Sequence, residues 1–72
     1  MIFFTNYANQ KFEILNKHQV FFRKEEIEDT VNNPDKAAKK GRYFHANKGG
    51  IKVIYGKKEE VLRIITFYPI KS

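Results

Sequence analysis

The segment Asn47–Lys48–Gly49–Gly50 constrains the fold more than any other part of the chain, because it predicts a tight β-hairpin turn. A strand-like run, residues 42–46, precedes this turn, and another, residues 51–55, follows it. A second turn is predicted over residues 56–60, and the most apolar run of the chain, residues 61–68, comes after it. The second half of the chain therefore predicts a three-stranded meander.

The first residues of the chain predict a strand followed by a helix. Residues 2–5 have the composition of a short strand, Ile-Phe-Phe-Thr. Asn6 is a good N-cap, and apolar residues at helical spacing then predict a helix over residues 7–16.

A second helix is predicted to begin near Arg23 or Lys24. It is expected to end at Asn32–Asn33–Pro34–Asp35, because the residue before a proline avoids helical backbone angles. The basic stretch that follows, residues 36–40, is either a loop or the ragged start of a strand.

These elements predict a single α+β domain over residues 1–72. The expected order is β-α-α-β-β-β, with two helices packed on one face of a small, mainly antiparallel sheet. A chain of 72 residues is near the lower size limit for a single hydrophobic core, and seven Phe and four Tyr supply much of that core.

The positive charge of the chain is concentrated in its second half. Residues 1–35 carry four basic and six acidic side chains, a formal charge of −2, whereas residues 36–72 carry ten basic and two acidic ones, a formal charge of +8. A cationic β-sheet surface is suited to a polyanion, and RNA is the expected one. The alternative is an ordinary domain with lysine-rich turns.

The absence of cysteine excludes disulfides, thiolate metal ligands and cysteine nucleophiles. It also favours an intracellular, cytoplasmic protein, as does an N-terminal segment unlike a signal peptide. No membrane association is expected, because no apolar run approaches the ~20 residues that span a bilayer. His18 and His45 have no carboxylates at metal-ligand spacing, so neither a metal nor another cofactor is predicted.

His45 is the strongest candidate for chemistry on RNA. Metal-free cleavage by a ribose 2′-hydroxyl needs proton transfer and stabilisation of the negatively charged phosphorane, and a histidine titrates in the useful range. If Arg42, Phe44 and Ala46 share one face of a strand, Tyr43 and His45 share the other. The alternative is a surface histidine beside a lysine-rich turn.

Arg63 and Tyr68 are the other predicted catalytic residues. Arg63 interrupts an apolar run, and simple alternation places it on the same face as Val61, Ile65 and Phe67. It either extends to solvent at an edge or binds phosphate on a face left open to substrate. Tyr68 ends the last strand, where it is either a site residue or a rim tyrosine covering the core.

Other cations and one aromatic residue are predicted to bind RNA. Lys52 alternates with two apolar neighbours and is expected to face away from them. Lysines elsewhere in the second half provide a general electrostatic attraction to phosphate. The predicted RNA-binding set is Lys40, Arg42, Tyr43, Lys48, Lys52 and Lys71.

Several segments, taken in order, resemble the RelE/ParE-like toxin superfamily. The opening Phe4–Thr5–Asn6–Tyr7–Ala8 resembles the strand and Thr-x-His-Ala start of a small, uncharacterised BrnT-like family within that group. Glu25–Glu26–Ile27 with Asn33–Pro34–Asp35 resembles its second helix and the Asn-Pro that closes it. Its last two strands are similar to residues 50–55 and to Ile64–Ile65–Thr66–Phe67–Tyr68–Pro69.

The resemblance implies a toxin-like domain whose sheet holds RNA and which a cognate antitoxin protein keeps inactive. It also implies a role for Tyr68, because related ribonuclease toxins use an aromatic or basic group at that position. Tyr7 stands where the family has histidine. A phenol, with a pKa of ~10, is a poor base at neutral pH, so any role of that imidazole is lost or altered.

Three functions follow from these observations. The first is the toxin of a type II toxin–antitoxin system, a metal-independent endoribonuclease that acts on mRNA, free or ribosome-bound. The second is a non-catalytic RelE/ParE-fold module that binds nucleic acid or inhibits a nucleic-acid enzyme. The third is a protein-interaction domain whose basic face receives an acidic antitoxin segment. The sequence does not decide between an enzyme and a non-catalytic relative.

Overall fold

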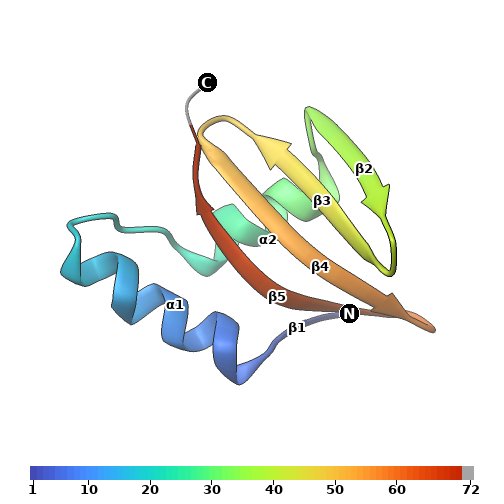
Figure 1. Cartoon of the computed structure of the whole chain (residues 1–72), viewed down its shortest axis with the longest axis horizontal. Helices are drawn as coiled ribbons and strands as arrows, with labels where there is room; N and C mark the ends of the chain where they lie inside the picture. The colour runs from blue at the N-terminus through green and yellow to red at the C-terminus, as the bar shows by residue number, and fades with distance from the viewer. Residues whose placement is uncertain (71–72) are drawn as a thin grey trace.

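The computed structural model describes residues 1–70, which form an α+β domain with two helices and one five-stranded mixed sheet (Figure 1). The elements are β1 (Ile2–Phe4), α1 (Asn6–Lys17), α2 (Lys24–Asn32), β2 (Lys36–Lys40), β3 (Tyr43–Lys48), β4 (Ile51–Lys58) and β5 (Val61–Pro69). The strand order is β1-β5-β4-β3-β2, with β1 parallel to β5 and every other neighbouring pair antiparallel.

The predicted element order lacked one strand. Lys36–Lys40 forms β2, so the second half of the chain is a four-stranded meander instead of a three-stranded one. Gly41 allows the chain to reverse within two residues, because its φ of 63° lies in the left-handed region that glycine adopts without strain. All five residues of β2 are exposed. Because neither face of this strand is buried, its sequence, Lys-Ala-Ala-Lys-Lys, does not need the alternation of apolar and polar residues that would indicate a strand.

Helix α1 begins one residue earlier than predicted because Thr5, not Asn6, is its N-cap. The Thr5 hydroxyl accepts a hydrogen bond from the backbone N–H of Ala8 at 3.1 Å. The same hydroxyl donates to the Ile64 carbonyl in β5 at 2.8 Å, so one side chain both starts the helix and joins it to the sheet.

Helix α2 begins at Lys24, within the predicted range. The Glu26 carboxylate accepts a hydrogen bond from the Arg23 backbone N–H at 3.0 Å, which satisfies a donor at the start of the helix. The helix ends at Asn32, before the predicted Asn-Pro stop.

The hydrophobic core lies between the two helices and one face of the sheet, here called the helix-covered face. Helix α1 packs against β5 and β1, and α2 packs against β4 and β3. In Figure 1, α2 lies behind the sheet and α1 lies along its β5 and β1 side. Phe67 is fully buried at the centre, with its ring centroid 4.6 Å from that of Phe12 in α1. Ile27, Val53 and Ile64 are also fully buried.

The opposite face of the sheet has no helix packed against it and is here called the open face. Strand alternation and the pairing register place alternate residues of all five strands on it. The open face comprises Phe3, Lys36, Ala38, Lys40, Tyr43, His45, Asn47, Lys52, Ile54, Gly56, Lys58, Val61, Arg63, Ile65, Thr66 and Tyr68.

A β-bulge in the β4–β5 ladder changes the alternation of β5. Ile54 pairs with Thr66 and Tyr55 pairs with Ile64, so Ile65 is the extra residue. Arg63 therefore lies on the open face while Phe67 points into the core. The prediction that these two residues share a face was wrong, because uninterrupted alternation does not allow for the inserted residue.

Neither helix within residues 1–70 is long and apolar enough to cross a membrane.

Candidate nucleic-acid interface

The open face gathers cations from three different strands. Lys36 and Lys40 come from β2, Lys52 and Lys58 from β4, and Arg63 from β5. None of the open-face positions defined above carries an acidic side chain. The predicted orientation of Lys52, away from its apolar neighbours, is confirmed by the register. This face therefore has a positive potential, which is partly offset near Arg63 by Glu59, a residue that lines a hollow together with Phe3 and Arg63.

His45 lies on β3, between β2, which carries Lys36 and Lys40, and β4, which carries Lys52. Its direct cross-strand neighbours are Ala38 on β2 and Ile54 on β4. Burial lowers the pKa of the His45 imidazole below its ordinary value, and the charges of Lys52 and Lys40 lower the pKa further. Both effects favour the neutral form of the imidazole.

A hollow of about 380 Å³ surrounds His45 on the open face. It is lined by Lys36, Ala37, Ala38, Lys40, His45, Asn47 and Lys52, and is here called the lysine hollow. Two polar atoms in it, Nδ1 of His45 and Oδ1 of Asn47, are buried and have no hydrogen-bond partner. Because unpaired buried polar atoms are costly, a bound polar group could supply the missing hydrogen bonds if either side chain turned toward the hollow.

Exposed aromatic side chains lie on the same face. The ring of Tyr43 covers Gly56, where an added Cβ would be 3.8 Å from the ring. The Arg63 guanidinium lies 5.8 Å from the ring centroid of Phe3, which is 51% exposed. Arg42 lines a second hollow together with Tyr43 and Arg63. These rings and guanidinium groups offer surfaces on which bases can stack.

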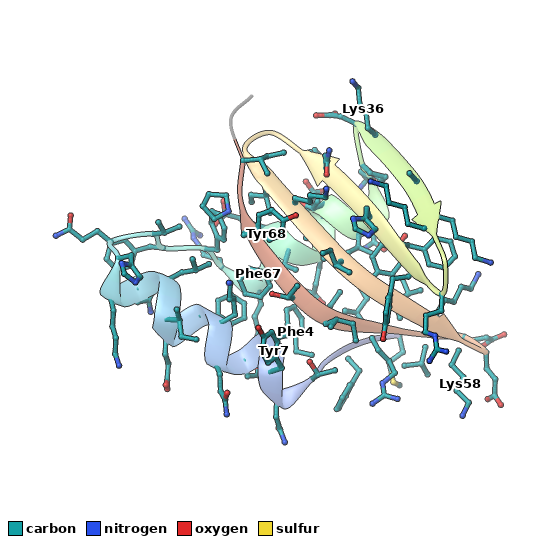
Figure 2. The ribbon with its side chains drawn as sticks, in the orientation of Figure 1. Phe4, Tyr7, Lys36, Lys58, Phe67 and Tyr68 are labelled. Atoms are coloured by element: carbon teal, nitrogen blue, oxygen red, sulfur yellow. The ribbon has the colours of Figure 1, made fainter. Side chains whose placement is uncertain are left out.

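Tyr68 lies directly opposite Lys52 in the β4–β5 ladder. The Lys52 ammonium is 6.0 Å from the centroid of the tyrosine ring, so an aromatic surface and a phosphate-binding cation are adjacent. Figure 2 shows Tyr68 on β5 and Lys36 at the beginning of β2, on well-separated strands of the sheet.

The three predicted catalytic residues share the open face but do not form a compact cluster. His45 on β3 and Tyr68 on β5 are separated by β4, which corresponds to about 12 Å between their Cα atoms at ordinary strand and residue spacing. Arg63 and Tyr68 are five residues apart along β5, or roughly 16 Å. They could act together only on a substrate that spans several nucleotides.

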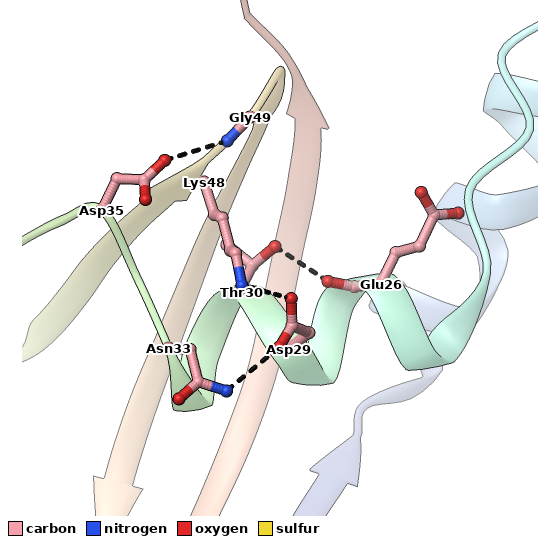
Figure 3. Close-up of polar contacts among 7 residues, drawn as sticks. All are labelled: Glu26, Asp29, Thr30, Asn33, Asp35, Lys48 and Gly49. Carbon is pink, nitrogen blue, oxygen red and sulfur yellow. Dashed lines mark hydrogen bonds and ion pairs between the residues drawn. The ribbon is translucent and has the colours of Figure 1, made fainter.

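Lys48 lies on the helix-covered side of the sheet, away from the other predicted RNA-binding residues. Its ammonium is 2.6 Å from the Asp29 carboxylate on α2, and Asn33 donates to the same carboxylate (Figure 3). Hydrogen bonds from Lys48 and Asn33 lower the pKa of Asp29. Lys48 therefore has a local partner and does not contribute to the cationic group on the open face.

Two further predicted site residues do not lie with His45. Tyr7 is in the first turn of α1 and is 61% exposed, but α1 packs at the β5 and β1 side of the sheet, two strands from β3. Lys71 lies outside the described residues. Within residues 1–70, no group of three or more His, Cys, Asp or Glu side chains could hold a metal ion.

Sequence reasoning did not single out Asn47 or Phe3. Asn47 was interpreted only as part of a turn, although its position two residues after His45 places both side chains on one face of β3. Phe3 was interpreted only as a strand residue. Its position on the open face depends on the parallel pairing of β1 with β5, which no local pattern indicates.

Comparison with known proteins adds no relative: no protein-family model matches the chain, and neither a curated protein nor a solved structure is similar to it.

Proposed function

We propose that this protein binds single-stranded RNA on the open face of its sheet. The observation that carries the proposal is the set of Lys36, Lys40, Lys52 and Arg63 on one helix-free face without an acidic residue among the positions that define it. Phosphate groups bind to such a surface by displacing counterions.

The aromatic rings of the open face support a single-stranded ligand over a duplex. Phe3, Tyr43 and Tyr68 lie on three different strands of this face, and bases that are free of pairing can stack on them. A base-paired duplex hides the faces of its bases and presents mainly phosphates, which would leave these rings unused.

The binding test uses fluorescence anisotropy with a labelled single-stranded RNA of about ten nucleotides over a range of salt concentrations. We expect the affinity of wild type to fall steeply with salt, and the Lys40→Gln/Lys52→Gln variant to bind at least tenfold more weakly. Lys39→Gln/Lys48→Gln is the matched control, because it removes the same charge from the helix-covered side. Equal weakening by both double variants would show that only net charge matters and would refute the proposed face.

A second candidate function is RNA cleavage without a metal, as expected for a toxin of the RelE/ParE-like superfamily. It is favoured by the lowered pKa of His45, which leaves a neutral imidazole beside Lys40 and Lys52. In such a reaction His45 would remove the proton from a ribose 2′-hydroxyl, whose oxygen attacks the adjacent phosphorus, and the two ammonium groups would stabilise the phosphorane. The P–O5′ bond then breaks to leave a 2′,3′-cyclic phosphate, and the imidazolium or water returns a proton to the 5′-oxygen. The α+β arrangement with both helices on one face is compatible with this superfamily.

Cleavage is tested by incubating mRNA with the protein in the presence of EDTA, with and without translating ribosomes. We expect fragments with wild type and none with His45→Ala, while His45→Ala still binds RNA. Expression in bacteria would arrest growth, and co-expression of the antitoxin would relieve the arrest. Intact RNA under both conditions would leave the protein as a non-catalytic RNA-binding module.

A further inference from the structure

The lysine hollow differs from the rest of the open face in charge, position and hydrogen bonding. Three lysines, Lys36, Lys40 and Lys52, line it from two strands. Its lining includes no carboxylate. Ala38, whose side chain is on the open face beside His45, is too short to fill it.

The hollow lies at the outer edge of the sheet, because β2 is the last strand in the order β1-β5-β4-β3-β2. The rings of the exposed Phe3 and the half-buried Tyr68 lie on the strands at the other side. An RNA strand that crosses the open face from β5 toward β2 therefore reaches the hollow at the edge of the sheet.

The charge of the hollow matches a phosphate end better than a phosphate within the chain. A phosphate monoester has a second pKa near ~6 and carries close to two negative charges at pH 7, whereas a backbone diester carries one. Three ammonium groups without a neighbouring carboxylate favour the more highly charged group.

The unpaired polar atoms provide an independent indication of a ligand. His45 and Asn47 are two residues apart on β3, so their side chains are neighbours on the same face of the sheet. Nδ1 of His45 and Oδ1 of Asn47 are both buried and lack a hydrogen-bond partner. The ribose next to a terminal phosphate carries hydroxyl groups that donate hydrogen bonds, and the Asn47 oxygen can accept one.

We propose that the lysine hollow is a subsite for a phosphate monoester, with Lys36, Lys40 and Lys52 binding the phosphate and Asn47 the adjoining ribose. The inference deepens the proposed RNA-binding function, because an RNA with a phosphorylated end would then be preferred over one that ends in hydroxyl groups. The same lysines would also bind a free phosphate monoester. The two experiments below distinguish this ligand from the phosphorylated end of an RNA.

The first experiment titrates isotopically labelled protein with inorganic phosphate and follows it by NMR, with sodium chloride at matched ionic strength as reference. We expect saturable shifts at His45, Ala38 and the Asn47 side-chain amide, together with a rise in the pKa of His45 as an anion offsets the lysine charges. Lys40→Gln should weaken phosphate binding about tenfold, the loss of one charge-assisted hydrogen bond. Lys39→Gln, on the other face of the same strand, should leave it unchanged. Shifts that chloride reproduces would overturn the subsite.

The second experiment compares one RNA sequence with a phosphorylated or a hydroxyl end by fluorescence anisotropy. We expect the phosphorylated RNA to bind about tenfold more tightly to wild type and equally to Lys40→Gln. Equal binding of both RNAs to wild type, without competition by inorganic phosphate, refutes the subsite but leaves RNA binding intact. Phosphate binding without affinity for either RNA refutes the proposed function and supports the subsite, whose ligand is then a free phosphate monoester.

Discussion

The Lys48 ammonium lies 2.6 Å from the Asp29 carboxylate and thereby joins the β3–β4 hairpin to α2. The nearby Asp35 carboxylate accepts a hydrogen bond from the Gly49 backbone N–H at 3.3 Å, so two acidic residues hold the same hairpin (Figure 3). Lys48 on β3 therefore lies on the helix-covered face and Lys52 on β4 lies on the open face, although the two are only four residues apart in sequence.

This difference predicts unequal effects of the two lysines on RNA binding. Lys52→Gln should reduce the slope of log K against log salt by about 0.7, the value for one phosphate contact with a single strand. Lys48→Gln should leave the slope unchanged and slightly lower the free energy of unfolding. The measurement is RNA affinity at several salt concentrations. A smaller slope with Lys48→Gln would contradict the assignment of the two faces.

His45 should make the stability of the protein depend on pH. Folding lowers the pKa of its imidazole through burial and the two lysines, so the unfolded chain binds the proton more tightly. The free energy of unfolding should therefore fall as pH decreases below the ordinary histidine value of 6.5, until the folded imidazole is protonated as well. Urea unfolding between pH 8 and pH 5 measures this decrease.

His45→Gln should remove that part of the pH dependence, whereas the control His18→Gln should retain it. The contribution of Asp29 is separate, because its lowered pKa acts only as pH falls through and below its ordinary value of 3.8. A profile that is identical for wild type and His45→Gln would contradict the predicted shift.

Phe67 and Tyr68 are adjacent in β5 but should differ sharply in their effect on stability. Phe67→Ala creates a cavity beneath Phe12 and should cost about 3–5 kcal/mol, a large part of the stability of a small domain. Tyr68→Ala, on the open face, should cost about 1 kcal/mol or less. It should also weaken RNA binding through the loss of a stacking surface.

Urea unfolding measures the first effect and anisotropy the second. If Tyr68→Ala destabilised the fold as much as Phe67→Ala, the tyrosine would be a core residue and not part of the interface.

Glu59 in the β4–β5 turn should be replaceable by glycine with a gain in stability. Its φ of 57° is in the left-handed region, which is unfavourable for a residue with a side chain by about 1 kcal/mol. Glu59→Gly should raise the free energy of unfolding by a similar amount. Glu60→Gly is the control, because Glu60 has no positive φ and glycine there should be destabilising. A gain from both changes would indicate an effect of charge and not of backbone conformation.

Local patterns were sufficient to predict both helices and the β3–β4 and β4–β5 hairpins, but not the β2–β3 hairpin. Helix α2 begins where predicted, and the Gly49–Gly50 turn joins two strands as expected. Strand β2 was left undecided because an exposed edge strand rich in lysine has no apolar face for its sequence to reveal. In the opening that resembles a toxin family, Thr5 caps α1 and Ala8 is fully buried, so both residues also have a structural role.

The candidate site could be predicted only in part. Alternation correctly placed Tyr43 and His45 together on β3, because that strand is regular. It failed for Arg63, whose face is set by the bulge at Ile65, and for Lys48, whose partner Asp29 is 19 residues away in sequence. The orientation of these side chains depends on pairing and packing between distant segments.

The parallel pairing of β1 with β5 has a consequence for how the protein is made. Met1 and Thr5 form backbone hydrogen bonds with Leu62 and Ile64, contacts that close a loop of nearly the whole chain. During synthesis, β1 has no partner until β5 has emerged from the ribosome, and its apolar residues remain accessible until then. We therefore expect the final ordering of this sheet to follow translation of β5, and a chaperone that shields extended apolar segments would act at that stage.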